Sequence, residues 1–285
     1  MMFGTMAAPG AGSAGHAPDA GGHAPPAAYR RAGAALATEW IKLRSLRFML
    51  VTALLGAVAS IGLADLASKN NAAGWTHLGA AQKAQFDPLA INFNFVIVGI
   101  LLFGVLGALV VTNEYGSGLI RATFAATPQR GLILAAKAVL AGLLSFALAV
   151  VIVFTAFFTG QAIISGAHAP YVSLGDHGVF GHLMGTAYYM TAAGLIGLFT
   201  GVLVRSAAAA ITSMFGLLLV LPLLADKIKP DAVTRHIVPY LPLNLGDEML
   251  HHHPGLSPGS AVAGLAAWVL VLAAAAAFSL RGRDA

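Results

Sequence analysis

Histidine clusters are the part of this sequence that most suggests chemistry. His251–His253 are consecutive in a proline-rich stretch, and His168, His177 and His182 lie close to Asp176. Imidazole binds metals and titrates near neutral pH. Consecutive residues do not share a helix face, however, so the 251–253 run is better explained as a solvated segment than as a ligand set. The second group is better explained as a polar turn, and we predict no metal site.

Recognised catalytic motifs are missing from the sequence. The chain has no cysteine, which excludes disulfides, thiolate metal sites and thiol catalysis. No lysine lies in G-x-x-x-x-G-K-[ST], the loop that binds nucleotide phosphates, and neither H-E-x-x-H nor G-x-S-x-G occurs. We therefore predict that the chain is not an enzyme, has no ATPase activity of its own and binds no cofactor.

The composition is that of a membrane protein. Of 285 residues, 58% are hydrophobic and 9% are charged, and the mean hydropathy is +0.80. Soluble domains carry about 25% charged residues. Uncharged runs cover 48–64, 88–113, 138–175, 177–204, 206–225 and 249–280. All but the first exceed the roughly 18 residues that a transmembrane helix needs. The expected fold is an all-α integral membrane protein with six transmembrane helices.

The distribution of positive charge predicts how these helices are oriented. The six predicted spans are 48–66, 91–112, 139–165, 183–204, 208–225 and 261–280. With the N-terminus inside, eleven lysines and arginines lie in inner segments and five in outer segments. This bias places both termini in the cytoplasm. It also accounts for the formal charge of +5 without a nucleic acid partner.

Two N-terminal segments precede the first span. Residues 1–28 are rich in Ala, Gly and Pro and have no periodic apolar face, so we expect them to be disordered. Residues 29–47 are expected to form an amphipathic helix in the lipid headgroup region. Trp40 lies on its apolar stripe, and the residues predicted on its polar side include Glu39, Lys42 and Arg44. An ordinary basic juxtamembrane stretch is the alternative.

A few polar residues and glycines remain inside the predicted spans. The polar residues could line a pathway or join helices by hydrogen bonds; they are Asn92, Asn94, Gln161, Tyr188 and Tyr189. Apart from Asp65 at a boundary, the spans contain no charged residue, which argues against an ion-coupled carrier. Small-residue stripes allow close helix packing, either within one bundle or at a dimer face; they are Gly99, Gly104 and Gly107, and Gly194, Gly197 and Gly201.

The longest inner loop, 113–137, is the strongest candidate for a functional segment. Gly116 and Gly118 allow a sharp turn out of the membrane. Residues 119–126 have the length of a two-turn helix, which Pro128 would end. A short helix held between two spans is a surface on which a partner protein could act. A merely basic loop that satisfies the positive-inside rule is the alternative.

This loop resembles the loop after the second span in permease subunits of type-2 ABC exporters. The matching run is Glu114-x-x-x-Gly118-Leu119-Ile120-Arg121-Ala122-Thr123, followed by Thr127-Pro128-x-Arg130 and Lys137. The stretch Glu39-Trp40-x-Lys42-Leu43-Arg44-Ser45-x-Arg47 is similar to the family's N-terminal connecting helix. The resemblance covers about residues 33–285. It implies that Glu114, Gly118, Arg121, Thr127, Pro128 and Arg130 lie on a coupling loop that docks into the ATP-binding subunit.

The resemblance also implies a function. It implies a multi-pass permease subunit in a bacterial cell membrane, forming half of an export pathway with a second copy or a paralogue. ATP and Mg²⁺ would be bound by a separate ABC ATP-binding subunit, and membrane lipids would surround the chain. The alternative is a membrane protein without transport activity, such as an immunity or assembly factor. The cargo is not predicted.

Overall fold

The computed structural model describes most of the predicted membrane region. The described residues are 33, 36–41, 47–118, 130–225, 237–250 and 257–282. Within them every regular element is helical, and six helices are long and apolar enough to cross a membrane. The prediction of a helical, multi-pass membrane protein is thereby confirmed. The cytoplasmic location of the termini remains a prediction, and residues 1–28 lie outside the described part.

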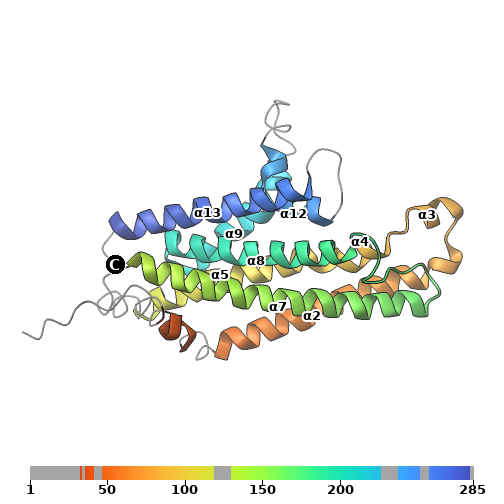
Figure 1. Ribbon diagram of the computed structural model, residues 1–285, viewed down its shortest axis with the longest axis horizontal. Coiled ribbons are helices and arrows are strands. Elements are labelled where there is room, and N and C mark those ends of the chain that lie inside the picture. The colour runs from red at the N-terminus through yellow and green to blue at the C-terminus, as the bar shows by residue number, and fades with distance from the viewer. Residues whose placement is uncertain are drawn as a thin grey trace, which may run out of the picture.

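Four long helices, α5, α7, α8 and α13, run along the long axis of the molecule (Figure 1). The helices that correspond to the six spans are α2 (Arg47–Ala73), α5 (Val96–Gly116), α7 (Arg130–Gly166), α8 (Val179–Val204), α9 (Ala207–Phe215) continued by η3 (Gly216–Val220) and α10 (Leu221–Ala225), and α13 (Pro258–Gly282). The shorter elements are η1 (Trp75–His77), α3 (Ala80–Ala84), α4 (Pro88–Asn92), η2 (Phe93–Phe95), η4 (Val238–Tyr240) and α12 (Pro242–Leu250).

Several helices begin or end beyond the predicted limits. α5 continues to Gly116 and α7 begins at Arg130, so the predicted loop 113–137 is reduced to 117–129. The predicted second span, 91–112, is divided into α4, η2 and α5. α4 begins at Pro88 because the Asp87 carboxylate accepts hydrogen bonds from the backbone N–H groups of Leu89 and Ala90, at 2.9 and 3.1 Å.

α8 is the central helix of the bundle. It contacts α5, α7, α9, α12 and α13, and 78% of its most apolar 18-residue window is buried, against 17% for α13. Glycines bring α5 and α8 into backbone contact. A Cβ on Gly197 would lie 1.9 Å from the carbonyl oxygen of Gly104, and one on Gly107 would lie 1.9 Å from that of Gly194. The two glycine stripes therefore pack against each other within one chain.

The fifth span changes its helical geometry halfway along. η3 is a π-helical turn, in which the N–H of Leu221 donates to the carbonyl of Gly216, five residues earlier. The next residue, Pro222, has no N–H to donate. Before this turn, α9 packs on α5 and α8 and buries Met214. After it, Ala225 of α10 packs with Val238, Leu241 and Trp268. The two halves of this span thus belong to different parts of the bundle.

Candidate functional site at the 117–129 end of the bundle

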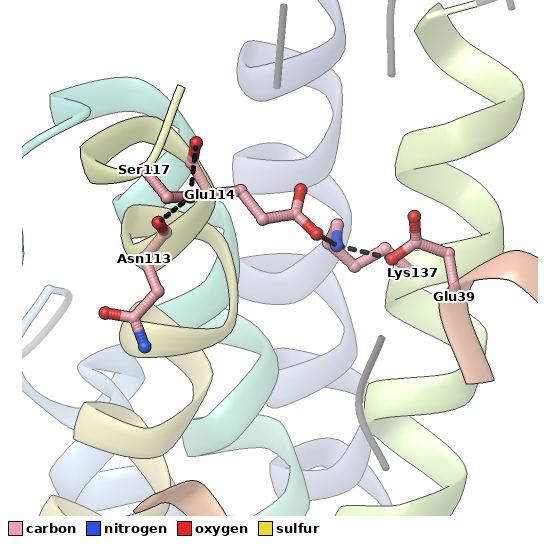
Figure 2. Close-up of polar contacts among 5 residues, drawn as sticks. All are labelled: Glu39, Asn113, Glu114, Ser117 and Lys137. Carbon is pink, nitrogen blue, oxygen red and sulfur yellow. Dashed lines mark hydrogen bonds and ion pairs between the residues drawn. The ribbon is translucent and has the colours of Figure 1, made fainter. Parts of the chain in front are cut away.

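Three charged side chains meet at the end of the bundle from which segment 117–129 leaves. Lys137 of α7 donates a 2.7 Å hydrogen bond to Oε1 of Glu114 on α5, and it also pairs with Glu39 (Figure 2). The exposed fractions are 4% for Lys137, 7% for Glu114 and 1% for Glu39. We call these residues the Glu39–Lys137–Glu114 cluster. It joins the helical segment 36–41 to both helices that flank the candidate loop.

The helices account for this convergence. Glu114 lies in the last turn of α5 and Lys137 two turns after the start of α7, so the link spans the two stems of the connecting segment. Removing charge from water costs several kcal/mol per ion, and close ion pairing is what makes burial tolerable. The ammonium group of Lys137 pairs with both carboxylates. Removing it would deprive two buried acids of the partner that they share.

The end of α5 is closed by its own side chains and backbone. The hydroxyl of Ser117 donates to the carbonyl of Asn113 at 2.8 Å and approaches that of Glu114 (Figure 2). Gly118 follows with φ +71°, the left-handed conformation that favours glycine. The sequence prediction of a sharp glycine turn is therefore confirmed at Gly118. Gly116, in contrast, is still part of α5.

Two further contacts hold the helices that surround this segment. Nη1 of Arg130, at the start of α7, donates a 3.0 Å hydrogen bond to the carbonyl of Leu280 near the end of α13. A cationic donor is favourable there because helix C-termini carry partial negative charge. Arg205, between α8 and α9, lies over the Tyr115 ring with its Cζ 5.5 Å from the ring centroid. Together these contacts connect α5, α7, α8 and α13 around the base of the loop.

The structure places only part of the predicted docking loop. Glu114, Gly118 and Arg130 lie at its two ends, whereas Arg121, Thr127 and Pro128 fall in the undescribed segment 119–129. The predicted two-turn helix at 119–126 falls there too. The structure therefore defines the frame of the loop and leaves its centre as a prediction.

One sequence expectation about charge needs correction. Glu39 is predicted on the polar side of an interfacial helix, but it is buried against Lys137, while Trp40 is 46% exposed. Glu114 and Lys137 lie outside the predicted spans 91–112 and 139–165, but the helices α5 and α7 continue through them. Lys137 was noted only for its place in the motif, and its role as a link was missed. Lys42 and Arg44 lie outside the described residues.

Asn92 and Gln161 form hydrogen bonds between elements at the other end of α7. The Asn92 amide donates to the Ala156 carbonyl at 2.9 Å and to the Ser68 hydroxyl at 3.3 Å. Gln161 donates to the Pro88 carbonyl at 3.1 Å and accepts from the N–H of Val172 at 3.0 Å. Of the two roles considered for these residues, the structure supports packing.

The two adjacent tyrosines of α8 also contribute to packing. The Tyr188 hydroxyl donates to the carbonyl of Val262 on α13 at 3.1 Å. Tyr189 is 1% exposed and lies against α12, where a Cβ on Gly246 would be 2.0 Å from its ring. The side chain of Asn94 lies outside the described part of the chain.

The histidines do not form a metal-binding group where the structure describes them. Among the described residues no three His, Cys, Asp or Glu side chains gather closely enough to hold a metal ion. His182 is buried and packs against Phe93, with ring centroids 5.1 Å apart. His251–His253 lie outside the described ranges.

The clearest arrangement of functional groups is therefore the charged frame around segment 119–129. It joins four helices and the segment 36–41 at one end of the bundle. Burying charged groups is costly unless they are paired, and these three are paired with one another. Comparison with known proteins adds no assignment: no family model matches the sequence, and no curated protein is significantly similar to it.

Proposed function

We propose that this chain is the membrane-spanning permease subunit of an ATP-driven ABC exporter. In this proposal segment 113–130 is the coupling loop that docks on a separate ATP-binding subunit. The support comes from two sources: the resemblance of the loop and of residues 39–47 to type-2 exporter permeases, and the six apolar helices of the structure. The chain lies in a bacterial cell membrane with both termini in the cytoplasm.

The observation that carries the proposal is the attachment of both ends of the loop to the bundle. Lys137 links the stem on α7 to the stem on α5, and Arg130 links it to α13. Because the stems are tied to several helices, a displacement of the loop by a partner would move those helices together. A basic loop whose only role was to satisfy the positive-inside rule would not need buried ion pairs where it joins the helices.

The remaining parts of the transporter are assigned to other molecules. The sequence contains no nucleotide-binding loop, so ATP and Mg²⁺ are bound by the partner ATPase. Six spans make half of a translocation pathway, which a second copy or a paralogue completes. Lipids contact the segment 36–41, where Trp40 and Ile41 are 46% and 68% exposed beside the buried Glu39. This pattern suits a helix at the membrane surface.

Co-purification tests the coupling proposal. The wild-type chain, extracted from its native membrane in mild detergent, should bring with it an ABC ATPase. Arg121→Glu and Ala122→Pro should reduce the amount of that ATPase several-fold, because they reverse a charge and break a helix on the docking surface. Arg235→Glu, in a segment predicted to lie outside, is the matched control and should have no effect.

The outcomes separate transport from the alternative. Equal recovery of the ATPase with all three variants would contradict the coupling loop. If the wild-type chain retains no ATPase at all, an immunity or assembly role becomes the better explanation. Membrane insertion of each variant, measured by resistance to alkaline extraction, ensures that a loss of ATPase is not a loss of folding.

A further inference from the structure

Arg205, in the turn between α8 and α9, is unusual in two respects. Its backbone is left-handed, with φ +60°, where glycine or asparagine is the common choice at the end of a helix. Nε and Nη2 of its guanidinium group are buried and have no hydrogen-bond partner within the described part of the chain. Both features cost free energy, and such outliers are concentrated at functional sites. Packing alone therefore does not explain this arginine.

The two unpartnered nitrogens indicate what Arg205 can bind. Nε and Nη2 form one edge of the planar guanidinium group, and their N–H bonds match two oxygens of a carboxylate or a phosphate. The face of the group is already used, because Cζ lies 5.5 Å from the centroid of the Tyr115 ring. The Tyr115 hydroxyl is also buried without a hydrogen-bond partner. The free edge therefore favours an anion that presents two oxygens.

The chain itself supplies few carboxylates for this edge. Glu39 and Glu114 share Lys137 as their partner. Residues 119–129, which follow the end of α5, include no Asp or Glu. The other acids of the predicted inner segments are Asp19 and Asp284, and both lie outside the described residues. An anion from outside the chain is therefore the better candidate.

The position of Arg205 between two spans places it at a membrane surface. The fifth span begins two residues later, at Ala207, and is 19 residues long. At 1.5 Å per residue its length is about 28 Å, so all of it is needed to cross a hydrocarbon core of roughly 30 Å. Arg205 then lies at the edge of that core for either orientation of the chain. The phosphate groups of phospholipids lie at the same level.

We propose that Arg205 binds the phosphate group of an anionic phospholipid. The residue is partly exposed although Nε and Nη2 are covered. Binding therefore includes a turn of the arginine side chain from the Tyr115 ring toward the headgroups. The proposal requires only that α8 and the fifth span cross the membrane, and it is independent of the proposed coupling to an ATPase.

Lipid titration of the purified, delipidated chain tests this assignment. Phosphatidylglycerol and diacylglycerol with the same acyl chains differ in the phosphate-containing headgroup. Native mass spectrometry should show that Arg205→Asn weakens the apparent Kd for phosphatidylglycerol about tenfold, because charge-assisted hydrogen bonds are lost. Arg205→Lys keeps the charge without the forked edge and should give a smaller loss. The affinity for diacylglycerol should be the same in all three chains.

Arg281→Asn is the matched control. Arg281 is an exposed arginine beside Leu280, at the end of the bundle where Arg130 binds the Leu280 carbonyl. Its replacement removes the same charge and should change the apparent Kd for phosphatidylglycerol less than twofold. Equal weakening by Arg281→Asn and Arg205→Asn would overturn the proposal, because it would show only a general attraction between basic residues and anionic lipid.

The Tm in detergent without lipid separates binding from a structural role. Asparagine adopts the left-handed conformation more readily and buries no charge, so Arg205→Asn should leave this Tm unchanged or raise it. A lower Tm with unchanged lipid affinity would make Arg205 a stacking residue for Tyr115 and overturn the proposal. If Arg205→Asn does not fold, Arg205→Lys decides, and an unchanged lipid affinity in that variant would count against bidentate binding.

Two further measurements distinguish the lipid from other anions. Inorganic phosphate should not raise the Tm of the wild-type chain as phosphatidylglycerol does. An equal rise would assign the site to a free phosphate and overturn the lipid as its source. Asp284→Asn should leave the lipid-free Tm unchanged, whereas a fall matched by no further fall in the Arg205→Asn background would identify Asp284 as an internal partner and overturn the proposal.

Discussion

The two ends of α7 are held by different chemistry. Near its start, Lys137 is buried between two carboxylates. Near its end, Gln161 exchanges neutral hydrogen bonds with backbone groups, and Asn92 reaches across from α4 to the carbonyl of Ala156. One acid near this second end, Asp65, is partly exposed and accepts a 2.6 Å hydrogen bond from Thr159.

This difference bears on how each end responds to change. Neutral hydrogen bonds between transmembrane helices contribute about 0.6 kcal/mol each on average. A buried ion cluster is different, because removing one charge takes a close, oppositely charged partner from the groups that remain buried. The Gln161 end is therefore expected to be tolerant and the Lys137 end sensitive. The end of α7 that we expect to be sensitive to substitution is therefore the end at which the sequence motif predicts a partner protein.

Lys137→Met should give the largest effect on stability. The variant keeps an aliphatic side chain of similar length but leaves Glu39 and Glu114 buried without the lysine charge. We expect the free energy of unfolding to fall by about 3–5 kcal/mol, measured as a lower Tm in detergent. Adding Glu39→Gln and Glu114→Gln should recover most of the loss. A Tm unchanged by Lys137→Met would show that the two ends of α7 do not differ in this way.

Gly197→Ala should have the next largest effect. The added methyl group would lie 1.9 Å from the backbone carbonyl of Gly104, which can yield only if α5 and α8 separate. Overpacking of this kind costs about 1–3 kcal/mol. Gly62→Ala is the control, since no atom lies within 4 Å of its Cβ position. If the two variants had equal Tm values, the close contact between α5 and α8 would not contribute to the stability of the bundle.

Asn92→Ala should have a moderate effect at the neutral end. It removes the hydrogen bonds to Ala156 and Ser68, and we expect a loss of about 1–2 kcal/mol in the free energy of unfolding. Asn71→Ala is a suitable control because the Asn71 amide is exposed and bonds only its own helix, to the carbonyl of Ala67. A loss as large as that of Lys137→Met would remove the contrast between the two ends.

Arg130→Gln should have the smallest effect, and a local one. It weakens the bond to the Leu280 carbonyl, and a cation at a helix C-terminus contributes about 0.3–1 kcal/mol. The end of α13 should then open more often, so trypsin should cleave faster after Arg281 while the Tm hardly changes. Lys83→Gln, at a partly exposed lysine over the Trp75 ring, should leave that cleavage rate unaltered. If Lys83→Gln increased the cleavage rate after Arg281 as much as Arg130→Gln does, the increase would reflect a general loss of stability and not the lost bond to Leu280.

The six membrane helices could be predicted because hydropathy reports burial in lipid directly. Long uncharged runs have no other stable arrangement than a spanning helix or a buried core. Hydropathy does not, however, predict where the helices end. It places Glu114 and Lys137 outside the spans because they are charged, although each neutralises part of the other's charge and the helices continue through both.

The position of Glu39 could not be predicted from its own segment. A helical wheel separates apolar from polar positions, but it cannot show that a lysine 98 residues away will face one of the polar positions. The glycine stripes of α5 and α8 raise the same difficulty, because spacing predicts a close helix contact and does not identify the partner helix. Asn92 and Gln161 were recognised as polar residues in apolar surroundings, and only the structure identifies the groups they bind.

The π-helical turn of the fifth span also has a mechanical consequence. Around Gly216–Val220 the hydrogen-bond ladder changes register, and Pro222 removes one donor just beyond it. Resistance to bending is therefore lowest at a single level of this helix. Its first half follows the glycine-packed pair α5 and α8, and its second half follows Trp268 of α13. A bend at this level would change how the second half of the segment lies against Trp268, while the first half stays packed on α5 and α8.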